Sequence, residues 1–264
     1  MPNSIAALPA NLGVIAKNTF RETVRDRILY NLVVFVLLIT ASAIFLGELT
    51  AGQEAKVIVD LGLSAMLVFG AFISIFVGVS LVWKEIEKRT VYSIFSKPIG
   101  RGEFVIGKYL GLCLTLLLNV AIMGAGVTLA LLYVGGGRLI GALWAATLLI
   151  YLELIVLTAV AIMFSSFSTP ALSALLTFFV FVIGHFSSAL RLLAADLGSA
   201  SARYFFGGIY YLLPNFSHFS FITETANGLI APASMLGRAG MLSIVYSVMI
   251  LSVTVAIFSR RNFK

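Results

Sequence analysis

Six long apolar stretches dominate the chain, and each is long enough to cross a lipid bilayer as a helix. A hydrocarbon core of ~30 Å is spanned by roughly 20 apolar residues in helical conformation. The alternation of apolar and polar residues that marks membrane β-barrel strands is absent, and in lipid only helices and closed barrels satisfy every backbone group. The sequence therefore predicts an all-α integral membrane protein with six transmembrane helices in one domain, residues 1–264. The expected spans are 28–47, 61–83, 109–134, 139–164, 171–190 and 240–259.

Composition agrees with this class and excludes a water-soluble domain. Of the 264 residues, 60% are hydrophobic and only 11% are charged, which is more apolar surface than a soluble domain of this length can bury. Most of the 18 Lys and Arg residues lie before the first span, between the second and third spans, or after the last. Because basic residues are enriched in cytoplasmic loops, both termini are expected inside. This asymmetry and anionic lipid account for the net charge of +7 without nucleic acid as a partner.

Two segments outside the spans have their own patterns. Within residues 1–27, apolar residues recur at helical spacing opposite a charged side, which predicts an amphipathic helix lying along the cytoplasmic interface. The extracellular segment 191–239 is rich in aromatic residues and interrupted by Gly207, Gly208 and Pro214. Short helices or a re-entrant hairpin would suit it. One additional span there is an alternative, but it would place the C-terminus outside.

A basic loop, residues 84–108, separates the second and third spans. It carries six Lys or Arg and three Glu residues, which is typical of a cytoplasmic docking surface. Residues 102–108 also fit the pattern G-x-x-x-x-G-K of a nucleotide-binding loop. Tyr109, however, stands where the magnesium-binding Ser or Thr is required, and no buried strand precedes the run. ATP binding by this chain is therefore not expected.

Few polar residues inside the spans are candidates for a function. Glu153 lies near the middle of the fourth span, where an ionised carboxylate is costly. It could belong to a translocation path or form a structural hydrogen bond between helices. Asn119, at mid-depth in the third span, is a candidate partner for it or a helix-packing residue. Cys113, His185 and His218 lack the convergent ligands that a metal site needs. We interpret both histidines as interfacial or core residues, and no metal site is expected.

Small residues at four-residue spacing predict close helix contacts. Gly70, Ser74 and Gly78 follow this spacing in the second span, and Gly107 and Gly111 do so at the entry to the third. Without large side chains between them, two helix backbones can approach closely in lipid.

The basic loop resembles the cytoplasmic loop of ABC-2 type permeases. The common form of that loop is acidic-x-x-Gly-Thr, two apolar residues, Pro with an aliphatic residue, Arg, and Gly-Lys. Arg89 stands here where Gly is usual. Residues 210–216, YYLLPNF, look similar to the permease subgroup associated with multicopper-enzyme maturation. The residues that carry the loop resemblance are Glu85, Glu87, Thr90, Ile94, Phe95, Pro98, Ile99, Arg101, Phe104, Gly107 and Lys108.

The resemblance implies the permease subunit of an ATP-binding cassette exporter, similar to type V exporters, in a bacterial or archaeal inner membrane. It implies a second permease chain, identical or paralogous, and a dimer of cytosolic ATPases that holds ATP and Mg. This chain would have no cofactor and no enzymatic activity. The alternative function is an ion-coupled carrier or channel, and the third possible function is a membrane scaffold subunit. The implied ATPase-coupling residues are Glu85, Glu87, Lys88, Arg89, Thr90, Ile94, Phe95, Pro98, Ile99 and Arg101, and the implied outer gate comprises Tyr210, Tyr211, Pro214, Asn215 and Phe216.

The expected orientation can be tested by labelling single cysteines in intact cells. In a background where Cys113 is replaced, cysteines at Gln53 and Ser199 should react with an impermeant thiol reagent, because both positions are expected outside. A cysteine at Ser96 should react only after the membrane is permeabilised. Labelling of position 96 in intact cells would show that the predicted orientation is wrong.

Overall fold

The described part of the chain is built from helices and turns, without a strand. The computed structural model describes residues 4–25, 34–35, 38–39, 41–42, 45, 52–87, 100–187, 204, 207–208 and 213–260. The all-α prediction is confirmed for these residues. The helices are α1 (Ser4–Arg25), α3 (Glu54–Glu87), α5 (Arg101–Tyr133), η1 (Gly137–Leu139), α6 (Ile140–Ser165), α7 (Pro170–His185), η2 (Phe216–Phe219), α10 (Ile222–Ala226) and α11 (Ala233–Arg260).

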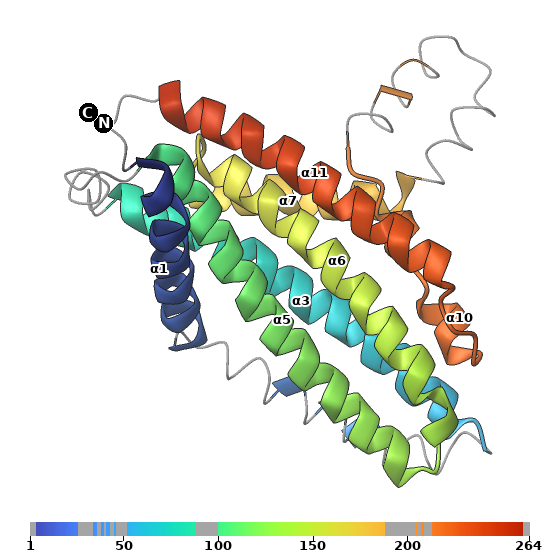
Figure 1. Ribbon diagram of the computed structural model, residues 1–264. Coiled ribbons are helices and arrows are strands. Elements are labelled where there is room, and N and C mark those ends of the chain that lie inside the picture. Colours follow the sequence, from blue (N-terminus) through green and yellow to red (C-terminus); the bar gives the residue numbers. More distant parts are fainter. Residues whose placement is uncertain are drawn as a thin grey trace.

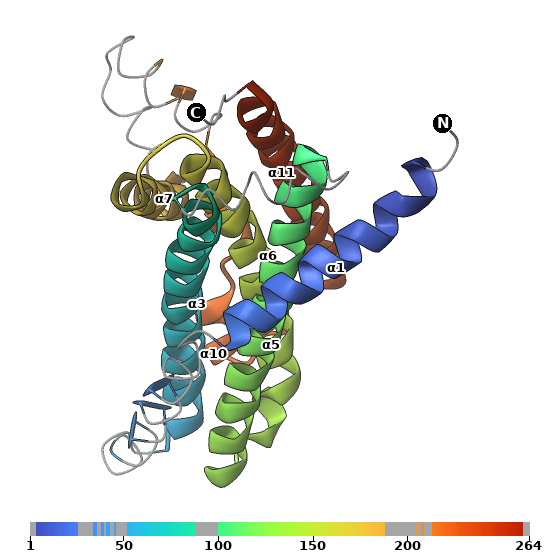
Figure 2. The same cartoon turned by 90° about the vertical axis from the view of Figure 1, so that its left-hand side faces the viewer.

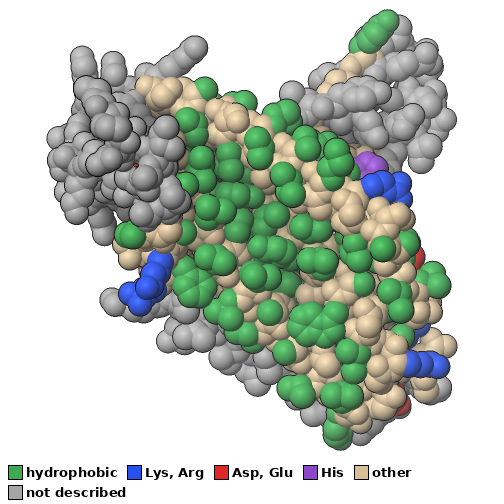
Figure 3. Space-filling view, in the orientation of Figure 1, with side chains coloured by type: hydrophobic (Ala, Val, Ile, Leu, Met, Phe, Trp, Pro, Cys, Tyr) green, Lys and Arg blue, Asp and Glu red, His purple; other side chains and the backbone are tan. Residues whose placement is uncertain are grey.

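Four of these helical regions are long and apolar enough to cross a membrane. They are Glu54–Leu81, Gly102–Tyr133, Gly137–Ser165 and Ala233–Ser259, and they correspond to the second, third, fourth and sixth expected spans. The apolar helix α7 has 16 residues and covers most of the fifth expected span, whereas the first, 28–47, lies largely outside the described residues. Hydrophobic side chains cover the face of the bundle in Figure 3, with Lys and Arg at its margins. The chain is a multi-pass membrane protein.

Helix α6 is the centre of the bundle. It packs against α3, α5, α7 and α11, and the four long helices run side by side along the bundle (Figure 1). A Cβ added to Gly70 of α3 would lie 2.4 Å from a Leu154 methyl group, and one added to Gly78 would lie 2.9 Å from the Ala161 Cβ. Between them, the Ser74 hydroxyl donates to the Leu154 carbonyl oxygen at 3.5 Å. The predicted close contact at the small residues of α3 is confirmed.

Helix α1 crosses α5 obliquely, and its first turns project beyond the bundle (Figure 2). The crossing point is made by glycines of α5. A Cβ at Gly107 would lie 2.6 Å from a methyl carbon of Ile15, and one at Gly111 would lie 2.7 Å from the Ala16 carbonyl oxygen. The residues of α1 that are buried here, Ala16, Thr19 and Thr23, are small. The two backbones therefore approach closely, as the glycine spacing predicted.

The basic loop is shorter than predicted from the sequence, because α3 continues to Glu87 and α5 begins at Arg101. The first turns of α5 are held by packing. Phe104 is buried and stacks on Phe258 of α11, with ring centroids 6.0 Å apart. Contacts of this kind extend the helix beyond the segment that hydropathy marks as the span.

Lys108 packs within the helices. Only 5% of it is exposed, its Nζ lies 3.5 Å from a Glu22 carboxylate oxygen of α1, and it lies 5.8 Å from the centre of the Phe104 ring. The whole G-x-x-x-x-G-K run, residues 102–108, is part of the continuous helix α5. The ion pair between Lys108 and Glu22 links α1 to the first turns of α5.

Enlarging Gly111 should displace α1. In Gly111→Ala the new methyl group would meet the backbone of α1, and overpacking of this kind costs about 1–3 kcal/mol. A cysteine at the buried position Thr19, with Cys113 replaced, should then react faster with a thiol reagent. Gly13→Ala is the matched control, because nothing lies within 4 Å of a Cβ there. Equal reactivity in both variants would contradict the proposed crossing.

Candidate functional site

A buried acidic side chain meets a histidine in the middle of the bundle. Glu153 of α6 is 1% exposed, and its Oε1 lies 3.2 Å from Nε2 of His185, the last residue of α7. The two helices are consecutive and joined by a short turn at Ser166–Thr169. Since antiparallel neighbours bring together residues at similar distances from their connection, Glu153 and His185 reach the same depth.

The imidazole is held from its other side. Nδ1 of His185 lies 3.0 Å from the carbonyl oxygen of Phe181. Because a carbonyl oxygen only accepts, Nδ1 carries a hydrogen and Nε2 faces the carboxyl group. The Glu153 Oε1 and His185 Nε2 atoms are close, but neither is aligned for a hydrogen bond with a described residue. The pair can share one proton, either as two neutral groups or as an ion pair.

Aromatic rings surround this pair. The Phe181 ring lies 4.6 Å from the imidazole, and the Phe216 ring lies 5.8 Å from it, between centroids. Phe216 in turn contacts Phe219, and both phenylalanines are buried. Such apolar surroundings strengthen the electrostatic interaction between the two polar groups and make an unpaired charge costly.

Phe216 reaches the pair because η2 packs into the bundle. Gly184 of α7 provides the space: a Cβ there would lie 2.5 Å from the Phe216 ring and 2.7 Å from the Pro214 carbonyl oxygen. Asn215 caps η2, since its Oδ1 accepts from the Ser217 amide at 3.0 Å and from the Ser217 hydroxyl at 2.6 Å. The same oxygen accepts a hydrogen bond from Ser187 just after α7. Segment 213–219 is thus fixed against the spans.

The predicted outer-gate residues divide accordingly. Pro214, Asn215 and Phe216 are all buried next to α7, whereas Tyr210 and Tyr211 lie outside the described residues. From η2 the chain continues to α10, which packs against α3 and α6. The aromatic segment therefore includes a part that enters the bundle.

Asn119 occupies a different place from Glu153. It is buried in α5, and its Nδ2 donates to the Thr115 carbonyl oxygen at 2.8 Å. Its Oδ1 has no hydrogen-bond partner in the described part of the chain. The close polar partner of Glu153 there is His185, and no hydrogen bond joins Glu153 to Asn119 among the described residues.

Three of the predicted coupling residues lie at the helix ends on either side of the basic loop. Glu85 and Glu87 are in the last turn of α3, and Arg101 is the first residue of α5. Lys88, Arg89, Thr90, Ile94, Phe95, Pro98 and Ile99 lie outside the described residues. The structure therefore shows the two helix ends that the loop connects, the end of α3 and the start of α5.

From the sequence His185 is interpreted as an interfacial or core residue, and its contact with Glu153 is not predicted. The signal was present in the chain. Glu153 and His185 are isolated polar residues in two consecutive apolar helices, at similar distances from the turn between them. Among the described residues, no group of three His, Cys, Asp or Glu could hold a metal ion.

Comparison with known protein families identifies the family of this chain. Residues 14–261 match the family model described as "ABC-2 family transporter protein". The match includes α1 from its middle turns onward, all four long helices and the Glu153–His185 pair. No curated protein matches the chain.

Filling the space at Gly184 should release η2 from α7. In Gly184→Ala the new methyl group would collide with Phe216 and with the backbone at Pro214, and overpacking should lower stability by about 1–3 kcal/mol. A cysteine at the buried position Ser187, with Cys113 replaced, should become accessible to a thiol reagent. Gly141→Ala in α6, where nothing lies within 4 Å, should change neither the melting temperature nor the labelling. An unchanged labelling rate in Gly184→Ala would show that η2 does not depend on this contact.

Proposed function

Because the chain belongs to the ABC-2 family of transporters, we propose that it is the permease subunit of an ATP-binding cassette exporter. It would form a translocation path with a second permease chain, identical or paralogous. Two separate cytosolic ATPase subunits, which bind ATP and Mg, would drive it. The family match over residues 14–261 carries this proposal. Both termini would lie in the cytoplasm, on the inner side of a bacterial or archaeal membrane.

The contact with the ATPase would be made by the loop between α3 and α5. The residues assigned to it are charged and apolar side by side, which suits an interface with apolar anchors and a polar rim. The helix ends that frame the loop support this role, because α5 is fastened there to α1 by Lys108 and Glu22 and to α11 by the stacking of Phe104 on Phe258. A displacement of the loop would therefore reach several helices together.

The outer gate would be the aromatic segment with Tyr210, Tyr211, Pro214, Asn215 and Phe216. Its buried part contacts the Glu153–His185 pair through Phe216, so a shift of α7 against α6 would also move the segment. Glu153 is the stronger candidate for the translocation path, since its carboxyl group meets a titratable partner. Asn119 stays a candidate because its Oδ1 is unpaired among the described residues.

An ion-coupled carrier is the second candidate, and the buried Glu153–His185 pair is the observation that favours it. Ionisable pairs at mid-depth are used as proton relays in carriers. The two candidates differ in their energy source. Transport by the chain in proteoliposomes without an ATPase, driven by a pH gradient and lost in Glu153→Gln, would favour the carrier.

Removing apolar anchors from the loop should weaken ATPase binding. In Ile94→Ala/Phe95→Ala, loss of two side chains that fill a pocket should cost on the order of 1–3 kcal/mol, so affinity for the cognate ATPase should fall about 5-fold to 150-fold. Co-purification and stimulated ATP hydrolysis measure this. Leu129→Ala/Tyr133→Ala is the matched control, because it removes exposed apolar side chains at the far end of α5. Unchanged assembly and ATP hydrolysis in the loop variant would show that these side chains do not bind the ATPase and that the loop only connects two helices.

A further inference from the structure

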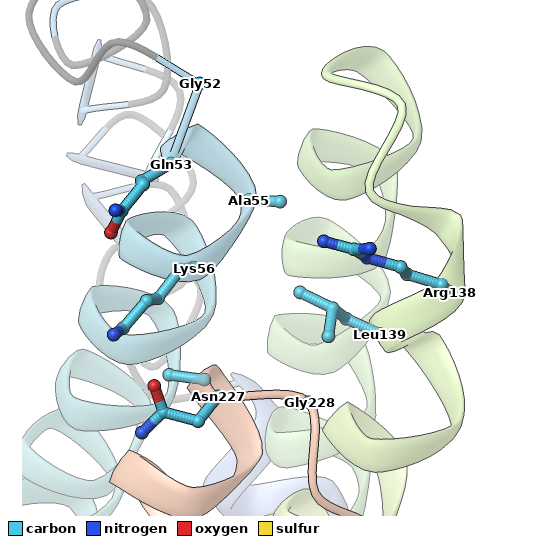
Figure 4. Close-up of a pocket in the computed structure, with 9 residues that line it drawn as sticks. Gly52, Gln53, Ala55, Lys56, Arg138, Leu139, Asn227 and Gly228 are labelled. Atoms are coloured by element: carbon cyan, nitrogen blue, oxygen red, sulfur yellow. The ribbon is translucent and has the colours of Figure 1, made fainter.

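A cavity of about 570 Å³ opens at the end of the bundle where α3 and α6 begin. Three parts of the chain meet around it: the start of α3, the η1 turn before α6, and the end of α10 (Figure 4). It has no part in the coupling loop or the buried pair. The lining residues are Gly52, Gln53, Ala55, Lys56, Arg138, Leu139, Ala226, Asn227 and Gly228.

The walls of the cavity are built by defined turns. Gly52 and Gly228 have φ angles of 91° and 89°, in the left-handed region that favours glycine. The Gly228 amide donates to the Thr225 carbonyl oxygen at 2.9 Å, and the Leu229 amide donates to that of Glu224 at 3.0 Å. A Cβ at Gly136 would lie 2.8 Å from the Ala55 Cβ, so the η1 turn is held close to α3. The cavity is thus part of the packed structure of this end.

Two cationic side chains from different helical elements line this cavity. Lys56 comes from α3 and Arg138 from η1. In Figure 4 the Arg138 guanidinium extends toward α3, whereas the Lys56 side chain extends along α3 away from Arg138. Neither forms an ion pair with a carboxylate in the described part of the chain, although Glu54 and Asp60 are close to Lys56 in sequence. Lys108 at the other end is different, since it is paired with Glu22. An anion bound in the cavity would be attracted by both positive charges.

We propose that this cavity is a binding site for a phosphate group. Arg138 offers a planar fork of donors that matches phosphate oxygens, and Lys56 offers a compact positive charge. The carboxamides of Gln53 and Asn227 add polar groups, although the Asn227 Nδ2 already donates to the Thr223 carbonyl oxygen at 2.9 Å. A volume of about 570 Å³ accommodates more than a simple ion, as a phosphate ester requires.

The phosphate can come from two sources. One is a soluble phosphate, and the other is the headgroup of an anionic phospholipid in the adjacent leaflet. In the proposed orientation this end of the bundle is outside, so the lipid would belong to the outer leaflet. The site does not depend on the ATPase, and it can be tested on the purified full chain.

Two binding measurements separate these sources. Inorganic phosphate is titrated against the chain in neutral detergent, with chloride at equal ionic strength as reference, and the melting temperature is followed. In parallel, the chain is placed in nanodiscs of phosphatidylcholine with or without phosphatidylglycerol, and retained lipid is counted by native mass spectrometry. A rise in melting temperature with phosphate identifies a soluble anion. Selective retention of phosphatidylglycerol without that rise identifies the headgroup.

The variants decide whether the cavity is responsible. Lys56→Gln/Arg138→Gln should weaken binding at least tenfold, and Gln53→Glu, which adds a carboxylate to the lining, should also abolish it. Lys17→Gln/Arg21→Gln is the matched control, because it removes two exposed basic residues from α1, far from the cavity. The proposal is overturned if neither phosphate nor phosphatidylglycerol binds, or if the control loses as much binding as the cavity variant.

Discussion

The structure depends on close approach between helix backbones at small residues. In lipid there is no hydrophobic driving force between helices, so association relies on van der Waals packing and hydrogen bonds. Gly70 and Gly78 join α3 to α6, Gly107 and Gly111 join α5 to α1, and Gly184 joins α7 to η2. Each of these glycines leaves no room for a Cβ. At Gly111 and Gly184 the atoms in the way include backbone carbonyl oxygens, so a single methyl group there would displace a whole segment rather than one side chain.

The buried Glu153–His185 pair is the second constraint, because burying ionisable groups inside a membrane costs free energy. A carboxyl group at mid-depth must be neutral or paired, and here its only close polar partner among the described residues is an imidazole that is itself fixed by Phe181. Phe216 lies against that imidazole. The segment that carries Phe216 is held by Asn215 and Gly184 rather than by the pair. The polar pair is thus placed at the meeting point of α6, α7 and η2.

Much of the architecture could be predicted from the sequence, because apolar runs and glycine spacing are local signals. The four long helices and the contact face of α3 were predicted in this way. Hydropathy marks the limits of lipid and not those of the helix, so the start of α5 at Arg101 was missed. The partner of Glu153 was also missed, since it depends on how α6 and α7 are paired across their turn. The cavity at Lys56 and Arg138 joins three distant parts of the chain, and no local pattern indicates it.

In the proposed function, the glycine contacts determine which helices would move together when the ATPase displaces the loop. The loop joins α3, which is locked to α6, with α5, which is locked to α1. The contacts between these helices leave no space for gradual compression, so α3 with α6 and α5 with α1 would move as pairs. Glu153 lies on α6, whereas His185 lies on α7, whose Gly184 meets Phe216 and Pro214 rather than α6. A movement of the first pair would therefore change the separation of Glu153 and His185 and, through Gly184 and Phe216, the position of the aromatic segment.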